Sequence, residues 1–139
     1  MTTTRERQSA TRSQGLMWVL YICDAGLLVA SGLIHLHFWD IAYRDVKTLK
    51  VLFLIQVALA LLAALTLLVT RHLLVIAGSM ALLAGTIVGF ILVRTVGLFG
   101  FKLTFTSGLA ATVLVIEIVA IVLLAITALL KLRPAGGRQ

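Results

Sequence analysis

Four long apolar segments decide what this chain can fold into. They cover about 16–38, 51–70, 73–96 and 108–130. Each contains about 20 residues, the length that a helix needs to cross roughly 30 Å of hydrocarbon. Runs this long and continuous lack the alternation of barrel strands, so helices are the expected spanning elements. The sequence therefore predicts an all-α integral membrane protein, a four-helix bundle made of two antiparallel hairpins.

The composition excludes a soluble alternative. Hydrophobic residues make up 61% of the 139 residues and charged residues only 12%. A soluble domain of this size leaves much of its surface in water and cannot hide so much apolar area. The lipid bilayer is therefore the expected partner of most of the chain. The net charge of +7 is scattered over tails and loops without a recognition motif, so we expect no nucleic-acid partner.

The two ends of the chain are polar. Residues 1–15 lack an apolar period, which predicts a disordered tail. Residues 131–139 form a second tail, because Pro134 and the following glycines end the last helix. With four spans, both tails lie on one side, where seven of the twelve Lys and Arg residues also lie. This bias predicts a cell (inner or plasma) membrane protein with both termini in the cytoplasm.

A glycine pattern marks one face of the third segment. Gly85 and Gly89 form a GxxxG motif, and Gly78 lies one heptad earlier. Small residues let helix backbones approach closely, which drives helix association in lipid. The pattern predicts a helix-packing face used within the chain, with contact between two copies as the alternative.

Ionisable side chains interrupt the apolar segments. Each costs ~2.5–3.5 kcal/mol near the middle of a membrane, so each needs a partner. At a rise of 1.5 Å per residue, four polar side chains fall in the same half of the membrane. We expect them to form a polar cluster in which Arg94 and Glu117 form an ion pair, assisted by Gln56 and His35.

Asp24 is a second acid, nearer the opposite surface. Ser79 of the third segment has a similar depth and is its expected hydrogen-bond partner. Both acids are open to two interpretations. They can fix the arrangement of the helices, or they can bind a proton or a ligand.

The string His35-Leu36-His37-Phe38-Trp39-Asp40 predicts histidines at the membrane interface beside aromatic residues, with a metal site at the outer surface as the alternative. Imidazole and carboxylate groups bind zinc or copper. Residues two apart on a helix point to nearly opposite sides, so His35, His37 and Asp40 meet only if the helix ends there. The third histidine, His72, lies at the other membrane edge. This separation argues against a haem held between two histidines of one chain, and no cofactor is predicted.

The sequence contains no glycine-rich phosphate loop, no Cys-x-x-Cys, no HExxH and no GxSxG. We therefore expect a protein that is not an enzyme. The leading hypothesis is an accessory or structural subunit of a larger membrane complex, with other subunits or a second copy as partners. The alternatives are a small proton-coupled transporter or channel, a homodimer using Asp24 or Glu117, and a metal or redox protein built on the histidine string.

Overall fold

The described part of the chain forms four helices in the computed structural model. The structure describes residues 2–43, 45, 47–97, 100, 102 and 108–133. Within these ranges, side chains are described from residue 11 onward, except those of residues 12, 42 and 43. The helices are α1 (Thr2–Phe38), α2 (Lys47–Thr70), α3 (Leu73–Thr95) and α4 (Gly108–Leu132), and a π-helical turn, η1 (Trp39–Tyr43), extends α1. The described part contains no strand. The all-α four-helix fold predicted from the sequence is confirmed.

All four helices are long and apolar enough to cross a membrane. Their lipid-facing surfaces carry large exposed apolar side chains, such as Leu74, Val69 and Leu129. In water such surfaces would drive aggregation, whereas in a bilayer they contact lipid tails. The protein is therefore a small multi-pass membrane protein.

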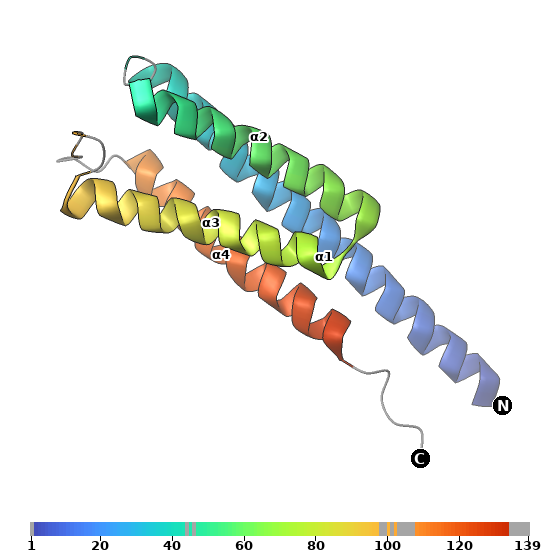
Figure 1. Cartoon of the computed structure of the whole chain (residues 1–139). Coiled ribbons are helices and arrows are strands. Elements are labelled where there is room, and N and C mark those ends of the chain that lie inside the picture. Colours follow the sequence, from blue (N-terminus) through green and yellow to red (C-terminus); the bar gives the residue numbers. More distant parts are fainter. Residues whose placement is uncertain are drawn as a thin grey trace.

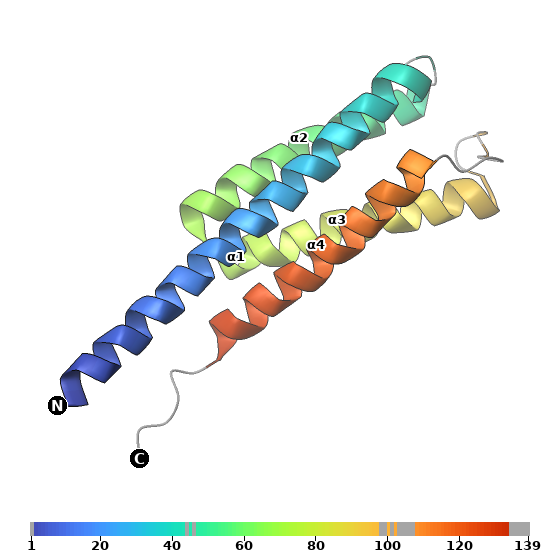
Figure 2. The ribbon, with the colours of Figure 1, turned by 180° about the vertical axis from the view of Figure 1, so that it is seen from behind.

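The helices form two antiparallel pairs (Figure 1). α1 and α2 run side by side, and α3 and α4 form the second pair, as the reverse view also shows (Figure 2). α1 also packs against α4. The turn Arg71–His72 joins the pairs at the end of the bundle where α1 begins and α4 ends (Figure 1). We call this the terminal end, and the opposite end, with η1, the last turn of α3 and the first turn of α4, the loop end.

The N-terminal segment differs from the sequence prediction. α1 begins at Thr2, so the prediction of a disordered tail over 1–15 is wrong for the residues described there. The segment contains no proline, and adding residues to an existing helix costs far less than nucleating one. These first turns project beyond the other helices (Figure 1). Of the predicted C-terminal tail, residues 134–139 lie outside the described residues.

The terminal half of the bundle is closely packed. Fully buried leucines from three helices, Leu28, Leu67 and Leu124, form its core with Ala120 and Ile76. At the terminal end, the Arg71 guanidinium lies 4.3 Å from the centre of the Trp18 ring. Lys131 donates a hydrogen bond to the Arg71 carbonyl oxygen. These contacts join α1, the α2–α3 turn and α4.

The predicted glycine packing is wrong within the chain. A Cβ atom added at Gly78, Gly85 or Gly89 would meet nothing within 4 Å. The close helix contact occurs instead at Gly32 of α1, where an added Cβ would lie 3.4 Å from that of Ala60 on α2. The physical reason is the course of α3. α2 and α3 meet near Arg71–His72 and diverge toward the loop end (Figures 1 and 2). Gly85 and Gly89 therefore line the space between these two helices, and Gly78 lines a smaller hollow nearer the turn.

Candidate functional site

The divergence of α2 and α3 leaves a cavity of about 720 Å³ in the loop-end half of the bundle. Most of its walls come from α2 and α3, and α1, η1 and α4 contribute the remainder. Gly85 and Gly89 line it, so their missing side chains help to make the space. The walls are largely apolar. Four polar side chains border the cavity, and these are His35, Gln56, Thr86 and Glu117.

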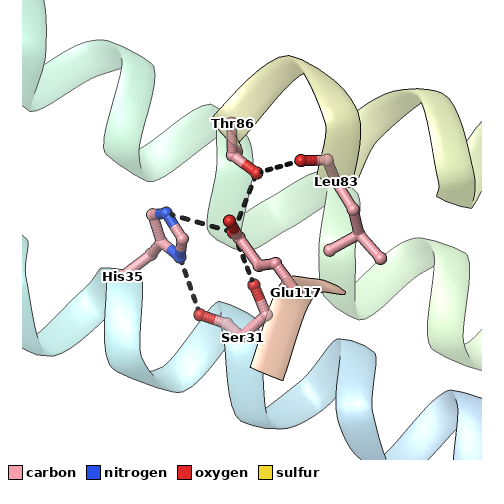
Figure 3. Close-up of polar contacts among 5 residues, drawn as sticks. All are labelled: Ser31, His35, Leu83, Thr86 and Glu117. Carbon is pink, nitrogen blue, oxygen red and sulfur yellow. Dashed lines mark hydrogen bonds and ion pairs between the residues drawn. The ribbon is translucent and has the colours of Figure 1, made fainter. Parts of the chain in front are cut away.

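Glu117 of α4 is the centre of the polar groups (Figure 3). Its side chain is nearly fully buried, with the residue 2% exposed. Ser31 of α1 donates its hydroxyl to Oε1 at 3.2 Å. The Thr86 hydroxyl of α3 lies 2.8 Å from the same oxygen and 2.7 Å from the Leu83 carbonyl oxygen, so its single hydrogen is shared between these two acceptors (Figure 3). His35 Nε2 lies 3.7 Å from Oε1. The carboxyl group therefore joins α4 to both α1 and α3.

The other carboxyl oxygen of Glu117, Oε2, has no hydrogen-bond partner among the described residues. Every polar contact that Glu117 makes with the described residues goes to Oε1, and Oε2 accepts no hydrogen bond from them. Gln56 of α2 is also buried, and its Nε2 donates no hydrogen bond to the described part of the chain. Both residues line the cavity. The cavity thus holds one acceptor and one donor whose hydrogen-bonding capacity is unused.

His35 is fixed on two sides. Its Nδ1 lies 2.8 Å from the carbonyl oxygen of Ser31, one helical turn earlier. Its ring contacts the ring of Phe53 on α2, with the two centres 5.4 Å apart. These contacts direct Nε2 toward Glu117 (Figure 3).

Arg94 does not join this cluster. It is exposed on α3, and the described structure contains no ion pair between Arg94 and Glu117. Glu117 lies level with Thr86, and eight further residues put Arg94 about 12 Å along the helix and about 80° around it. The predicted ion pair is therefore not formed, and hydroxyl groups take the place of the arginine.

Asp24 has a different partner from the predicted one. Thr127 of α4 donates its hydroxyl to Asp24 Oδ2 at 2.7 Å. Ser79, the predicted partner, donates instead to the Val75 carbonyl oxygen of its own helix. Asp24 projects from α1, which packs against α2 and α4 but lies diagonally opposite α3. Its other oxygen, Oδ1, has no hydrogen-bond partner among the described residues.

The histidine string does not form a metal site in this conformation. α1 stays helical through Phe38, so His35 is buried at the cavity while His37 is exposed on another face. The described part of the chain contains no cluster of three His, Cys, Asp or Glu residues that could hold a metal ion. The metal hypothesis required the helix to end at the histidines, and it continues past them. His72 caps α3 at the opposite end of the bundle, where its Nδ1 accepts from Leu74 N.

Sequence reasoning missed the three hydroxyl donors, Ser31, Thr86 and Thr127. A signal was present in the spacing: Asp24, Ser31 and His35 are seven and four residues apart, which places them on one face of α1. Thr127 lies ten residues after Glu117, and both belong to the buried residues of α4, with Ala120 and Leu124 between them.

Comparison of the chain with family models, with curated proteins and with solved structures found no match. The functional inference therefore rests on the geometry of the cavity and its polar groups.

Proposed function

We propose that this membrane protein binds a small lipophilic molecule in the α2–α3 cavity, with Glu117 as the polar anchor, and that it acts as a small membrane carrier rather than as an enzyme. The observation that carries the proposal is the coincidence of an apolar cavity with a buried acid. Ligand sites are typically concave and apolar, about 300–1,000 Å³ in volume, with a few convergent polar groups. The cavity of about 720 Å³ around Glu117 has these properties.

The contrast between the two halves of the bundle supports a carrier. The cavity lies in the loop-end half, whereas Leu28 and Leu124 fill the terminal half and Lys131 joins α4 to the α2–α3 turn. A carrier opens its binding site to one side of the membrane at a time. A bundle with a cavity in the loop-end half and a filled terminal half fits a state that opens toward the loop end. Of the two acids that the sequence offered for coupling, only Glu117 lines the cavity. The proposal places the protein in the cell membrane with both termini cytoplasmic, and it requires no cofactor.

A photoactivatable lipophilic probe tests the proposal. The full chain in phosphatidylcholine nanodiscs would be labelled with an aryl diazirine and mapped by mass spectrometry. We expect labelling of the cavity residues Leu52, Val93 and Leu114 that excess unlabelled probe prevents. Labelling of lipid-facing Leu74 and Val122 should persist under the same competition. Labelling that is confined to lipid-facing residues, with no component that competition removes, would contradict the proposal.

The second candidate function is an accessory or structural subunit of a larger membrane complex. The uncovered glycine face of α3, Gly78, Gly85 and Gly89, favours it, because glycine faces allow close packing of a helix from another subunit or a second copy. Extraction from the native membrane in mild detergent would decide between the two. Copurification of a stoichiometric partner protein that covers the α3 glycine face would support the role of an accessory subunit. Extraction of the chain alone, with saturable probe binding retained, would support the role of a carrier.

A further inference from the structure

His35 can exist in only one neutral form at this site. The carbonyl oxygen of Ser31 accepts hydrogen bonds and cannot donate them, so the Nδ1 atom 2.8 Å away carries a hydrogen. In the neutral ring, Nε2 is then an acceptor with a lone pair. This Nε2 lies 3.7 Å from Glu117 Oε1, which is also an acceptor (Figure 3).

Two facing acceptors repel each other unless a proton lies with one of them. If Glu117 carries the proton, a neutral acid faces a neutral imidazole. If His35 carries it, a carboxylate faces an imidazolium. In both cases the pair holds one proton and has no net charge, as a buried site requires because uncompensated charge is costly in a low dielectric.

Among the described residues, no Lys or Arg side chain contacts Glu117. The groups that face Glu117 are Ser31 and His35 from α1, Gln56 from the α2 wall and Thr86 from α3. Among these described neighbours, His35 alone can titrate. Arg94 lies about 12 Å farther along α3. A positive charge for the carboxylate must therefore come from a proton or from the occupant of the cavity.

We propose that the site selects a lipophilic amine in its protonated form, which binds in exchange for the proton shared by Glu117 and His35. The inference rests on the proposed function, because it names the ligand class of the same cavity. An ammonium N–H donates to the free Oε2 of Glu117, and the apolar body fills the cavity walls. A hydroxyl, ether or carbonyl group on the ligand can accept from Gln56 Nε2.

The exchange balances in protons and charge. Before binding, the pair of Glu117 and His35 has one shared proton and no net charge. When the ammonium ion binds, Glu117 is a carboxylate, His35 is neutral, and the proton leaves for water. The buried site again has no net charge. Retaining the proton would leave one uncompensated positive charge in the membrane interior, which is why the exchange is favoured.

Three probes with one apolar body test the ligand class. They are 1-pyrenebutylamine and the matching alcohol and carboxylic acid, titrated against the full chain in phosphatidylcholine nanodiscs, with empty nanodiscs as the background. We expect the amine to bind about tenfold or more tightly than the alcohol, because a charge-assisted hydrogen bond in a largely apolar site is stronger than a neutral one. The net charge of +7 would attract the carboxylate non-specifically, so a preference for the amine cannot come from the overall charge.

Glu117→Gln is the matched variant. It keeps an oxygen that accepts from Ser31 and Thr86 but removes the charge, so the amine should bind no more tightly than the alcohol. Asp24→Asn is the control, since Asp24 lies outside the cavity lining, and it should keep the preference for the amine.

Calorimetry of the wild-type chain in two buffers of different ionisation enthalpy tests the exchange without any variant. We expect about one proton released per amine bound at acidic pH, declining to none at alkaline pH.

The outcomes separate this inference from the proposed function. Equal binding of amine and alcohol, an amine preference that persists in Glu117→Gln, or amine binding at acidic pH without proton release would overturn the inference while leaving a lipophilic ligand site. Absence of saturable binding for all three probes would contradict the proposed function itself.

Discussion

The two buried acids of this protein lie in opposite halves of one bundle and differ in their surroundings. Asp24 lies in the packed terminal half, bonded to Thr127 and adjoining the Leu28 and Leu124 core. Glu117 lies in the loop-end half, beside a cavity, with two hydroxyl donors and a histidine around one oxygen. Both acids are buried, and each has one carboxyl oxygen without a hydrogen-bond partner among the described residues. What distinguishes Glu117 from Asp24 is the open space beside it, so the ligand role proposed for Glu117 depends on the cavity and not on burial.

Leucine truncations on α4 should show the largest difference between the halves. Leu124→Ala removes a fully buried side chain from the terminal core, and we expect a loss of about 2–5 kcal/mol in unfolding free energy because a void remains. Leu114 faces the existing cavity, so Leu114→Ala should lower the unfolding free energy by well under half as much as Leu124→Ala. Unfolding of the purified variants in mixed micelles with increasing SDS measures both. Equal losses would mean that the loop-end half is as closely packed as the terminal half.

Enlarging small residues gives the opposite test. Ala120→Leu inserts bulk where no space remains, since Ala120 is fully buried, and should destabilise by about 1–3 kcal/mol. Gly89→Leu places the same side chain in open space and should leave stability unchanged or raised by up to ~1 kcal/mol, because glycine is a poor helix former. The same unfolding assay applies. A Gly89→Leu protein less stable than Ala120→Leu would show that the cavity does not exist.

Removal of single hydroxyl groups should have the smallest effects. Thr127→Val deprives Asp24 of the hydrogen bond to Oδ2, and we expect a loss of about 1 kcal/mol, near the upper range for such bonds between membrane helices. Ser31→Ala leaves Thr86 as a donor to Glu117, so a loss of about 0.5 kcal/mol is expected. The double variant Ser31→Ala, Thr86→Val should lose more than the sum of its single changes. Strict additivity would show that the two donors do not act on one shared carboxyl group.

Sequence reasoning was effective where helix length and depth decide the outcome. Apolar length predicts the four helices, and counting residues along them puts His35, Gln56 and Glu117 in the same half, where all three line one cavity. It failed where the outcome depends on the position of a residue around the helix axis and on which helices pack against each other. Arg94 falls in the same half of the bundle as Glu117, but it lies about 12 Å farther along α3 than Thr86, the residue level with Glu117, and about 80° around the helix. Ser79 matches Asp24 in depth, but α1 packs against α4 rather than α3.

The α3 glycines illustrate a further limit. A GxxxG motif indicates a face that can approach another helix, but the motif does not determine whether a helix lies there. In this chain, α2 diverges from α3 and leaves Gly85 and Gly89 on a cavity wall. The close contact at Gly32 and Ala60, which the motif does not include, joins α1 and α2 instead.

Saturation binding of a lipophilic probe to the full chain, with Gly89→Leu and Gly78→Leu as matched variants, tests the central claim most directly. Both glycines are uncovered on α3, but Gly89 lines the large cavity and Gly78 a smaller hollow nearer the turn. We expect a single saturable site per chain in the wild type and in Gly78→Leu, and its loss in Gly89→Leu. Unchanged binding in Gly89→Leu, or no saturable site in the wild type, would contradict the account.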